Sequence, residues 1–131
     1  MFATIINSKK PIGINDTLFS NYMKLRVTGR VWIETPNGTF AGSGRIALLE
    51  KIKELGSITD AAKSMKMSYR QAWEQIDAMN KQSENPVVIK VSGGAGGGGS
   101  VVTKEGDRVI KMYKQLEKNF DTFVKKESTK I

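Results

Sequence analysis

The alternation of apolar and polar positions is most regular between residues 57 and 81, where it has the period of a helix. Ser57 and Ser68 each precede an apolar stretch, and a serine in this place accepts hydrogen bonds from the N–H groups of a first helical turn. Spacings of three and four residues put the apolar side chains of each stretch on one face. The pattern predicts a helix-turn-helix over residues 57–81, connected at Lys66-Met67. The apolar positions are Ile58, Ala61, Ala62 and Met65 in the first helix, and Ala72, Trp73, Ile76 and Met79 in the second.

Upstream of this stretch the pattern has a period of two, which is typical of strands. Apolar and polar residues alternate from Met23 to Ile33, and the turn sequence TPNG follows at residues 35–38. Proline and Asn-Gly favour the backbone angles of a tight turn. We therefore expect a β-hairpin over residues 22–42.

A helix is predicted over residues 45–55, between the hairpin and the helix-turn-helix. Gly56 follows it, and a glycine in this place commonly caps a helix in the left-handed conformation. Residues 1–21 have no clear period, so we expect an N-terminal arm ahead of one domain at 22–131. The inward positions of the predicted helix are Ile46, Leu48, Leu49, Ile52 and Leu55.

Strand, loop and strand follow the helix-turn-helix, over residues 87–102. The loop is a run of glycines, and it lacks the GxxxxGK[ST] pattern of a nucleotide-binding loop. A flexible linker is one explanation of the run, and the tip of a wing is the other. Thr103 is a good N-cap for a last helix over residues 104–126. Together these elements predict an α+β fold, a winged helix-turn-helix with an extra N-terminal β-hairpin and a long C-terminal dimerisation helix.

Charge and composition reduce the range of possible functions. The chain of 131 residues carries a net charge of +8, which favours a polyanionic partner. It has no cysteine and no histidine, which excludes Cys-His and Ser-His-Asp triads and most zinc and haem sites. An enzyme is therefore improbable, and no cofactor is expected. We find no signal peptide and no apolar run of bilayer length, so we expect a cytoplasmic protein without membrane contact.

The second helix of the helix-turn-helix is the candidate recognition helix for double-stranded DNA. Its outward positions carry side chains that suit base edges and phosphates. Trp73 is instead expected to anchor the core, because it shares the inward arc with Ile76. The predicted DNA-binding residues are Lys66, Ser68, Tyr69, Arg70, Gln71, Glu74, Lys90, Ser92, Gly93, Gly94 and Lys104.

The last helix has an apolar seam that favours a homodimer. Its apolar residues recur at alternating spacings of three and four, as in a coiled coil. The alternative is that this helix packs on its own domain, and this alternative is favoured for the first half of the helix. The predicted dimer contacts are Val109, Tyr113, Leu116, Phe120 and Phe123.

Residues 45–125 resemble the N-terminal DNA-binding domain of the ModE family of molybdate-responsive transcriptional repressors. The resemblance implies a winged-helix dimer that binds a palindromic operator. In that family separate C-terminal β domains bind molybdate, and nothing in this sequence corresponds to them, so molybdate is not expected as a ligand. A dimeric winged-helix adaptor that binds proteins and not DNA is the alternative function. The matching residues are Gly56-Ser57-Ile58, Ala61-Ala62, Met67-Ser68-Tyr69-Arg70, Ala72-Trp73, Met79-Asn80, the glycine-rich loop, Thr103 and Gly106.

Overall fold

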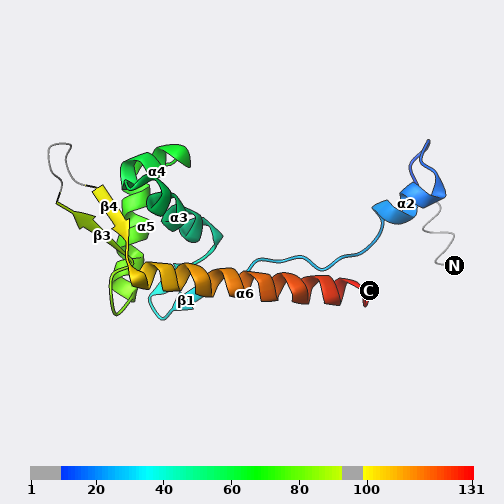
Figure 1. The fold of residues 1–131 in the computed structure, drawn as a ribbon. Coiled ribbons are helices and arrows are strands. Elements are labelled where there is room, and N and C mark those ends of the chain that lie inside the picture. The colour runs from blue at the N-terminus through cyan, green and yellow to red at the C-terminus, as the bar shows by residue number, and fades with distance from the viewer. Residues whose placement is uncertain (1–9, 93–98) are drawn as a thin grey trace. The chain divides into compact units, whose positions relative to one another are not determined.

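The structure is a computed structural model that describes residues 10–92 and 99–131. These residues form an α+β fold with five helices and two separate antiparallel sheets of two strands each (Figure 1). The chain divides into two compact units. The larger is Arg30–Asp121, and the smaller combines Met1–Gly29 with Thr122–Ile131.

Three helices build the core of the larger unit: α3 (Ser43–Leu55), α4 (Ile58–Ser64) and α5 (Tyr69–Gln82). Their buried side chains come from the apolar faces that the sequence pattern predicts, and burial of apolar surface is the main stabilising term of a fold. Leu55 is an exception, because it is 41% exposed instead of inward. The helical members of the core are Ile46, Leu48, Leu49, Ile52, Ile58, Ala61, Ala62, Ala72, Ile76 and Met79.

Local signals fix where these helices begin and end. Ser57 Oγ accepts a hydrogen bond from Asp60 N at 3.1 Å, and Ser68 Oγ accepts one from Gln71 N at 3.1 Å. Gly56 ends α3 with a φ of 69°, in the left-handed region that glycine adopts without strain. Lys66, in the connection between α4 and α5, has a φ of 56°. The predicted caps and the tight connection are therefore confirmed.

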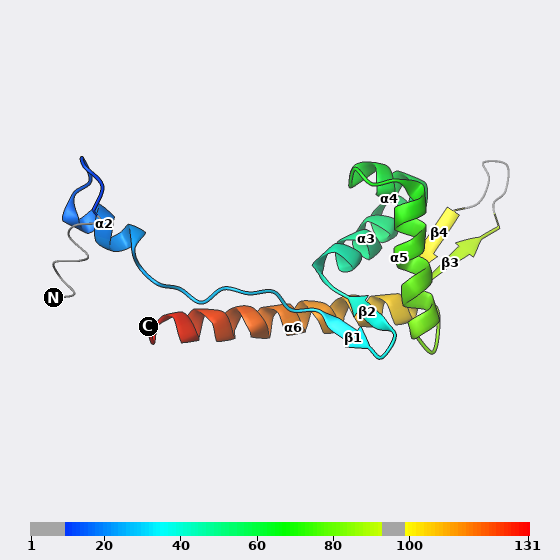
Figure 2. The same ribbon diagram turned by 180° about the vertical axis from the view of Figure 1, so that it is seen from behind.

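The first hairpin is shorter than predicted. β1 (Ile33–Thr35) pairs with β2 (Gly38–Ala41), and Gly38 has a φ of 116° in the turn. The strand expected from Met23 begins only at Ile33. Alternation alone was insufficient there, because a strand also needs a neighbour for its backbone N–H and C=O groups. Gln82 Nε2 donates to Thr39 O at 3.0 Å, so the hairpin is tied to the end of α5 (Figure 2).

The second hairpin follows α5. β3 (Val88–Val91) and β4 (Gly99–Val102) pair antiparallel, with Val88 opposite Val102 and Val91 opposite Gly99. Residues 93–98 lie outside the described part of the chain. Ser100 N also donates to Gly56 O at 2.9 Å, which joins β4 to the end of α3.

The last helix, α6, spans Lys104–Ser128. Thr103 caps it as predicted, because its Oγ1 accepts from Gly106 N at 3.0 Å. Gly106 is buried where a Cβ would overlap the backbone oxygen of Val87, just before β3, so α6 passes this residue too closely for any side chain. Val109 and Tyr113 are fully buried in the core of the larger unit. The chain's own residues already cover both side chains, so their burial does not support the prediction that they contact a second protomer.

The smaller unit contains a helix that the sequence pattern did not predict. α2 (Asp16–Tyr22) lies in the region expected to be an irregular arm, and Asn15 caps it by accepting a hydrogen bond from Leu18 N at 2.8 Å. Only Phe19 is buried in this seven-residue helix, so the segment lacks the repeated apolar spacing that identifies longer helices. Lys10 pairs with Asp16 and, by its hydrogen bond and charge, lowers the pKa of that carboxyl group.

Helices long and apolar enough to cross a membrane do not occur among residues 10–92 and 99–131.

Candidate nucleic-acid interface

The outward face of α5 carries most of the predicted DNA-binding side chains. Arg70, Gln71 and Glu74 are exposed, whereas Ala72 and Ile76 on the opposite face are fully buried. Arg70 leaves 88% of its side chain open to solvent. The burial of one face fixes the rotation of the helix, so the polar face is held outward and can meet the edges of bases.

Arg70 is paired with Glu74 one helical turn later. Arg70 Nε donates to Glu74 Oε1 at 3.0 Å. This bond runs through the Nε–H of the guanidinium group, and its two terminal NH2 groups are not part of it. Two parallel N–H donors match the O6 and N7 acceptors of guanine in the major groove. An exposed pair of this kind contributes little stability.

Tyr69 and Lys90 come together at a shallow hollow of about 230 Å³ beside the start of α5. Ser57, Thr59 and Ser100 complete its polar wall, so the start of α4, the start of α5 and the β3–β4 hairpin all meet there. The sequence predicts Tyr69 and Lys90 as interface residues separately. It does not indicate Ser57, Thr59 and Ser100, because their proximity depends on how the β3–β4 hairpin packs against the end of α3.

Lys90 also contacts Trp73. Its Nζ lies 4.8 Å from the centre of the Trp73 ring, which is a cation–π contact. Trp73 is only partly buried and packs at the border of the core. The expectation that Trp73 anchors the core is thus met only in part, because the indole lies between the core and Lys90 of β3.

The other predicted residues are spread more widely. Lys66 is exposed in the left-handed connection before α5, and Ser92 is exposed at the end of β3. Lys104 lies with Ile89 and Arg108 in a different hollow, at the start of α6. The structure does not bring Lys104 together with Tyr69 and Lys90. Gly93 and Gly94 lie outside the described residues.

The remaining predicted dimer contacts lie further along α6. Leu116 and Phe120 are half-buried, and Phe123 is 54% exposed. Tyr113, now a core residue, donates from its hydroxyl group to Val31 O at 2.7 Å. Burial raises the pKa of this hydroxyl group, and the nearby charge of Glu117 raises it further.

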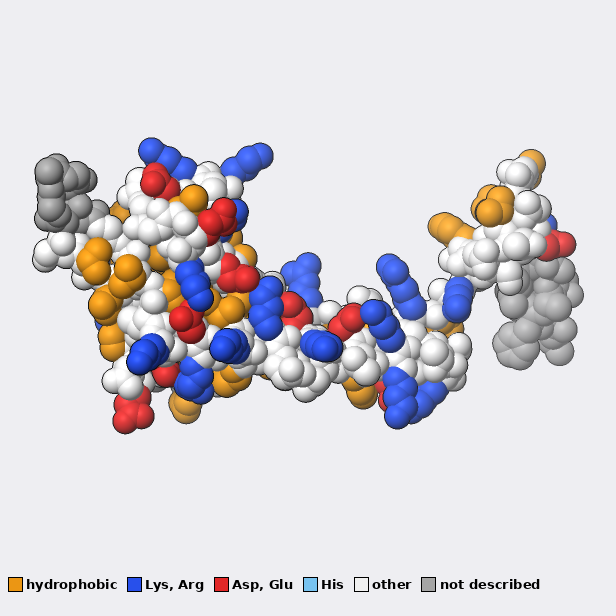
Figure 3. All heavy atoms as spheres, in the orientation of Figure 1, with side chains coloured by type: hydrophobic (Ala, Val, Ile, Leu, Met, Phe, Trp, Pro, Cys, Tyr) orange, Lys and Arg blue, Asp and Glu red, His pale blue; other side chains and the backbone are white. Residues whose placement is uncertain are grey.

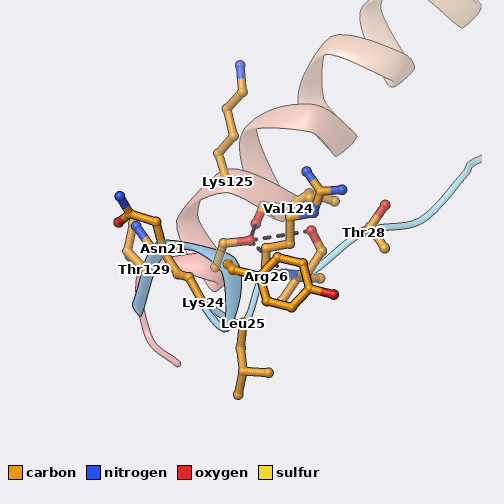
Figure 4. A pocket seen from close by; sticks show the side chains of 11 residues that line it. Asn21, Lys24, Leu25, Arg26, Thr28, Val124, Lys125 and Thr129 are labelled. Atoms are coloured by element: carbon orange, nitrogen blue, oxygen red, sulfur yellow. Dashed lines mark hydrogen bonds between the residues drawn. The ribbon is translucent and has the colours of Figure 1, made fainter. Parts of the chain in front are cut away.

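Another hollow lies in the smaller unit (Figure 4). Its volume is about 760 Å³, and Lys24, Arg26 and Lys125 contribute basic groups to its lining. Val27 N donates to Ser128 Oγ at 2.8 Å, which ties the extended segment to the last turn of α6. None of the predicted DNA-binding residues lines this hollow, and residues 10–92 and 99–131 contain no group of three or more acidic side chains that could hold a metal ion.

The sequence is similar to several curated regulators, although no protein-family model matches it. It is 39% identical to the "Molybdenum transport protein ModE" of Azotobacter vinelandii over 106 residues, which is 81% of this chain and 39% of that protein. It is 44% identical to the "DNA-binding transcriptional dual regulator ModE" of Escherichia coli K12 over 86 residues, 63% of this chain and 33% of that protein. It is 41% identical to the "Molybdenum-pterin-binding protein MopB" of Rhodobacter capsulatus over 80 residues, 61% of this chain and 30% of that protein.

The chain thus spans at most about two-fifths of the length of these relatives. Their names are those of regulators and of proteins of molybdenum transport or binding. The expectation that this chain does not bind molybdate gains no support from these names.

Proposed function

Because the chain belongs to the ModE family by its sequence, we propose that it is a transcriptional regulator that binds double-stranded DNA as a dimer through a winged helix-turn-helix. In this proposal α4 and α5 are the helix-turn-helix, α5 is the recognition helix, and β3–β4 is the wing. The observation that carries the proposal is the polar outward face of α5, with Arg70 and Gln71, together with Lys90 of the wing, which lies beside Tyr69 at the start of the same helix. The proposal gives the chain no catalytic role.

Each part of the interface has a distinct task in this proposal. Arg70 and Gln71 read base edges in the major groove, and Glu74 restricts the orientation of Arg70. Ser68, at the start of α5, and Lys66, just before it, contact phosphates. Lys90 contacts a phosphate from the wing, with Tyr69 beside it. Phosphate contacts position the protein, and base contacts give the sequence preference.

The proposed dimer places one α5 in each half of a palindromic site. Two-fold symmetry in the protein then matches two-fold symmetry in the DNA, with half-sites about one helical turn apart. We propose Leu116, Phe120 and Phe123 on α6 as the contacts between protomers, in place of the buried Val109 and Tyr113. The apolar seam of α6 supports this choice.

Arg70→Ala tests the recognition face. The variant should lose about 1–3 kcal/mol of specific binding, the range for a bidentate contact with a base, while it keeps the melting temperature of the parent. Arg108→Ala is the matched control, because Arg108 is also a helix-surface arginine bonded to a glutamate, Glu105, at 3.0 Å. Equal affinity of Arg70→Ala and the parent for the operator would show that the recognition face is misassigned.

A protein-binding adaptor is the second candidate, and one observation favours it. The outer face of the β3–β4 hairpin carries Ile89, Val91 and Val101, each about 40% exposed. Figure 3 shows hydrophobic side chains gathered over these strands. Contiguous exposed apolar surface often marks a protein interface. Duplex binding that is absent even at low salt, together with retained dimerisation, would favour the adaptor.

Molybdate is the ligand on which the sequence expectation and the names of the relatives differ. We propose that this chain binds DNA with equal affinity with and without molybdate, because tight oxyanion binding needs an enclosed set of N–H donors and cations. Calorimetry with molybdate, and operator binding with and without it, tests this. A micromolar site coupled to DNA affinity by about 1 kcal/mol would contradict the proposal.

A further inference from the structure

The base of the wing is held by one side chain of the recognition helix. Asn80 lies near the end of α5, and its Oδ1 accepts hydrogen bonds from Val87 N at 2.8 Å and Val88 N at 3.4 Å. Its Nδ2 donates to Val88 O at 3.1 Å. One amide side chain therefore bonds three backbone groups at the point where β3 begins. Such a pattern fixes both the position and the rotation of the backbone.

The same segment is held from the other side by the start of α6. Thr103 N donates to Val87 O at 3.0 Å, and Thr103 Oγ1 donates to Pro86 O at 2.6 Å. Thr103 follows β4 directly, so both ends of the hairpin converge on residues 86–88. These bonds join the wing to α6, whereas the bonds of Asn80 join it to α5.

A second contact lies further along the wing. Asn80 and Trp73 are seven residues apart, about two turns, and therefore lie on the same side of α5. Lys90 Nζ lies 4.8 Å from the Trp73 ring, two residues beyond Val88 in β3. The wing thus meets α5 at two places, a hydrogen-bonded base and a cation–π contact.

On the basis of the proposed function, we infer that Asn80 is a positioning residue that fixes the wing on the recognition helix, so that Lys90 and the outward face of α5 meet DNA together. Both polar atoms of the Asn80 amide group already bond backbone groups of Val87 and Val88, so its proposed role requires no contact with DNA. Its effect on binding is indirect. A wing that swings freely must be ordered each time DNA binds, and that ordering reduces affinity.

The first experiment needs no DNA. Hydrogen exchange is measured on the parent, Asn80→Ala, Asn80→Asp and the control Asn119→Ala, an exposed asparagine whose Oδ1 accepts a side-chain bond from Gln115 Nε2 at 2.9 Å. Asn80→Ala should speed exchange of the amides of β3 and β4 by about tenfold or more, with the buried amides of α3 within about threefold of the parent. Asn80→Asp keeps the acceptor but loses the donor to Val88 O. Its exchange rates in β3 and β4 should therefore lie between those of the parent and those of Asn80→Ala. Uniform acceleration of all amides would show that Asn80 only stabilises the fold.

The second experiment measures DNA binding at a temperature where every variant is folded. In a hydroxyl-radical footprint, Asn80→Ala should lose the backbone protection that the wing gives, and should keep the backbone protection on either side of the groove that α5 occupies. Its affinity for DNA should fall about tenfold. The slope of log affinity against log salt should become shallower by the equivalent of about one phosphate contact per protomer. A lower melting temperature alone would not remove the protection by the wing while it leaves the protection by α5 unchanged. An unchanged footprint and salt dependence would overturn the positioning role.

The two experiments separate failure of the inference from failure of the proposed function. If the parent protein binds no duplex at low salt, the DNA-binding function is wrong, whereas faster exchange confined to the wing still shows that Asn80 holds the wing on α5. If the parent binds DNA and Asn80→Ala behaves like Asn119→Ala in both experiments, only the role of Asn80 is wrong.

Discussion

The two units of the chain contain similar patterns of residues, but only the larger unit has an extensive core. Among the described residues, every buried hydrophobic side chain except Phe19 belongs to Arg30–Asp121. The smaller unit instead exposes Leu18, Tyr22 and Leu25. An apolar pattern shows which side chains gain from burial, and the remainder of the chain determines whether a surface exists to bury them.

Two stretches with strand-like sequences make the difference concrete. Val88–Val91 is mainly β-branched, and it forms a strand because Gly99–Val102 pairs with it. Apolar and polar residues alternate from Met23 to Val27, but no strand pairs with that stretch in the described chain.

The largest effect should come from truncation of the same residue type in each unit. Leu49 has no exposed surface, so Leu49→Ala should reduce the free energy of unfolding by about 2–5 kcal/mol. Leu25 is 68% exposed, and Leu25→Ala should stay within about 0.5 kcal/mol of the parent. Denaturant unfolding of both variants measures the contrast. Equal destabilisation by the two substitutions would show that the core of the smaller unit stabilises the protein as much as that of the larger unit.

Substitution of two glycines by alanine should change the stability less, and the space around each glycine determines the direction of the change. A Cβ at Gly106 would overlap the backbone oxygen of Val87, and Gly106→Ala should destabilise by about 1–3 kcal/mol. A Cβ at Gly44, in the first turn of α3, would meet no atom within 4 Å, so Gly44→Ala should be neutral or stabilising by up to about 1 kcal/mol. Thermal melts compare the two. A neutral Gly106→Ala would mean that α6 is further from β3 than the structure shows.

Tyr113→Phe should destabilise the protein less than Leu49→Ala at neutral pH, by about 1 kcal/mol for the lost hydrogen bond to Val31 O. Because burial raises the pKa of the Tyr113 hydroxyl group, the folded state favours its neutral form. This contribution is complete below about pH 10, the ordinary pKa of tyrosine, and is lost as the pH rises through the raised value. Unfolding curves from pH 7 to 11 should show a steeper alkaline loss in the parent than in Tyr113→Phe. Parallel curves would contradict the burial of this group.

Local signals in the sequence were sufficient to predict the helices of the larger unit, because caps such as Ser57 and Ser68 act within one turn. They were also sufficient to place Arg70 and Gln71 outward. The spacing of Val109 and Tyr113 shows that α6 has an apolar face, but it does not show whether a second protomer or the chain's own core covers that face. Asn80 bonds backbone groups seven and eight residues away, across a change of element. Such contacts depend on packing and have no local signature.

The central claim is that this basic chain binds duplex DNA through α5 and the wing, and the salt dependence of its affinity tests it most directly. Affinity for operator and random duplexes is measured from low to moderate salt. Each phosphate contact should add about 0.9 to the slope of log affinity against log salt, so several contacts per dimer should give a steep decline for both duplexes. The operator should be preferred throughout. A flat response, or no binding at low salt, would contradict the account.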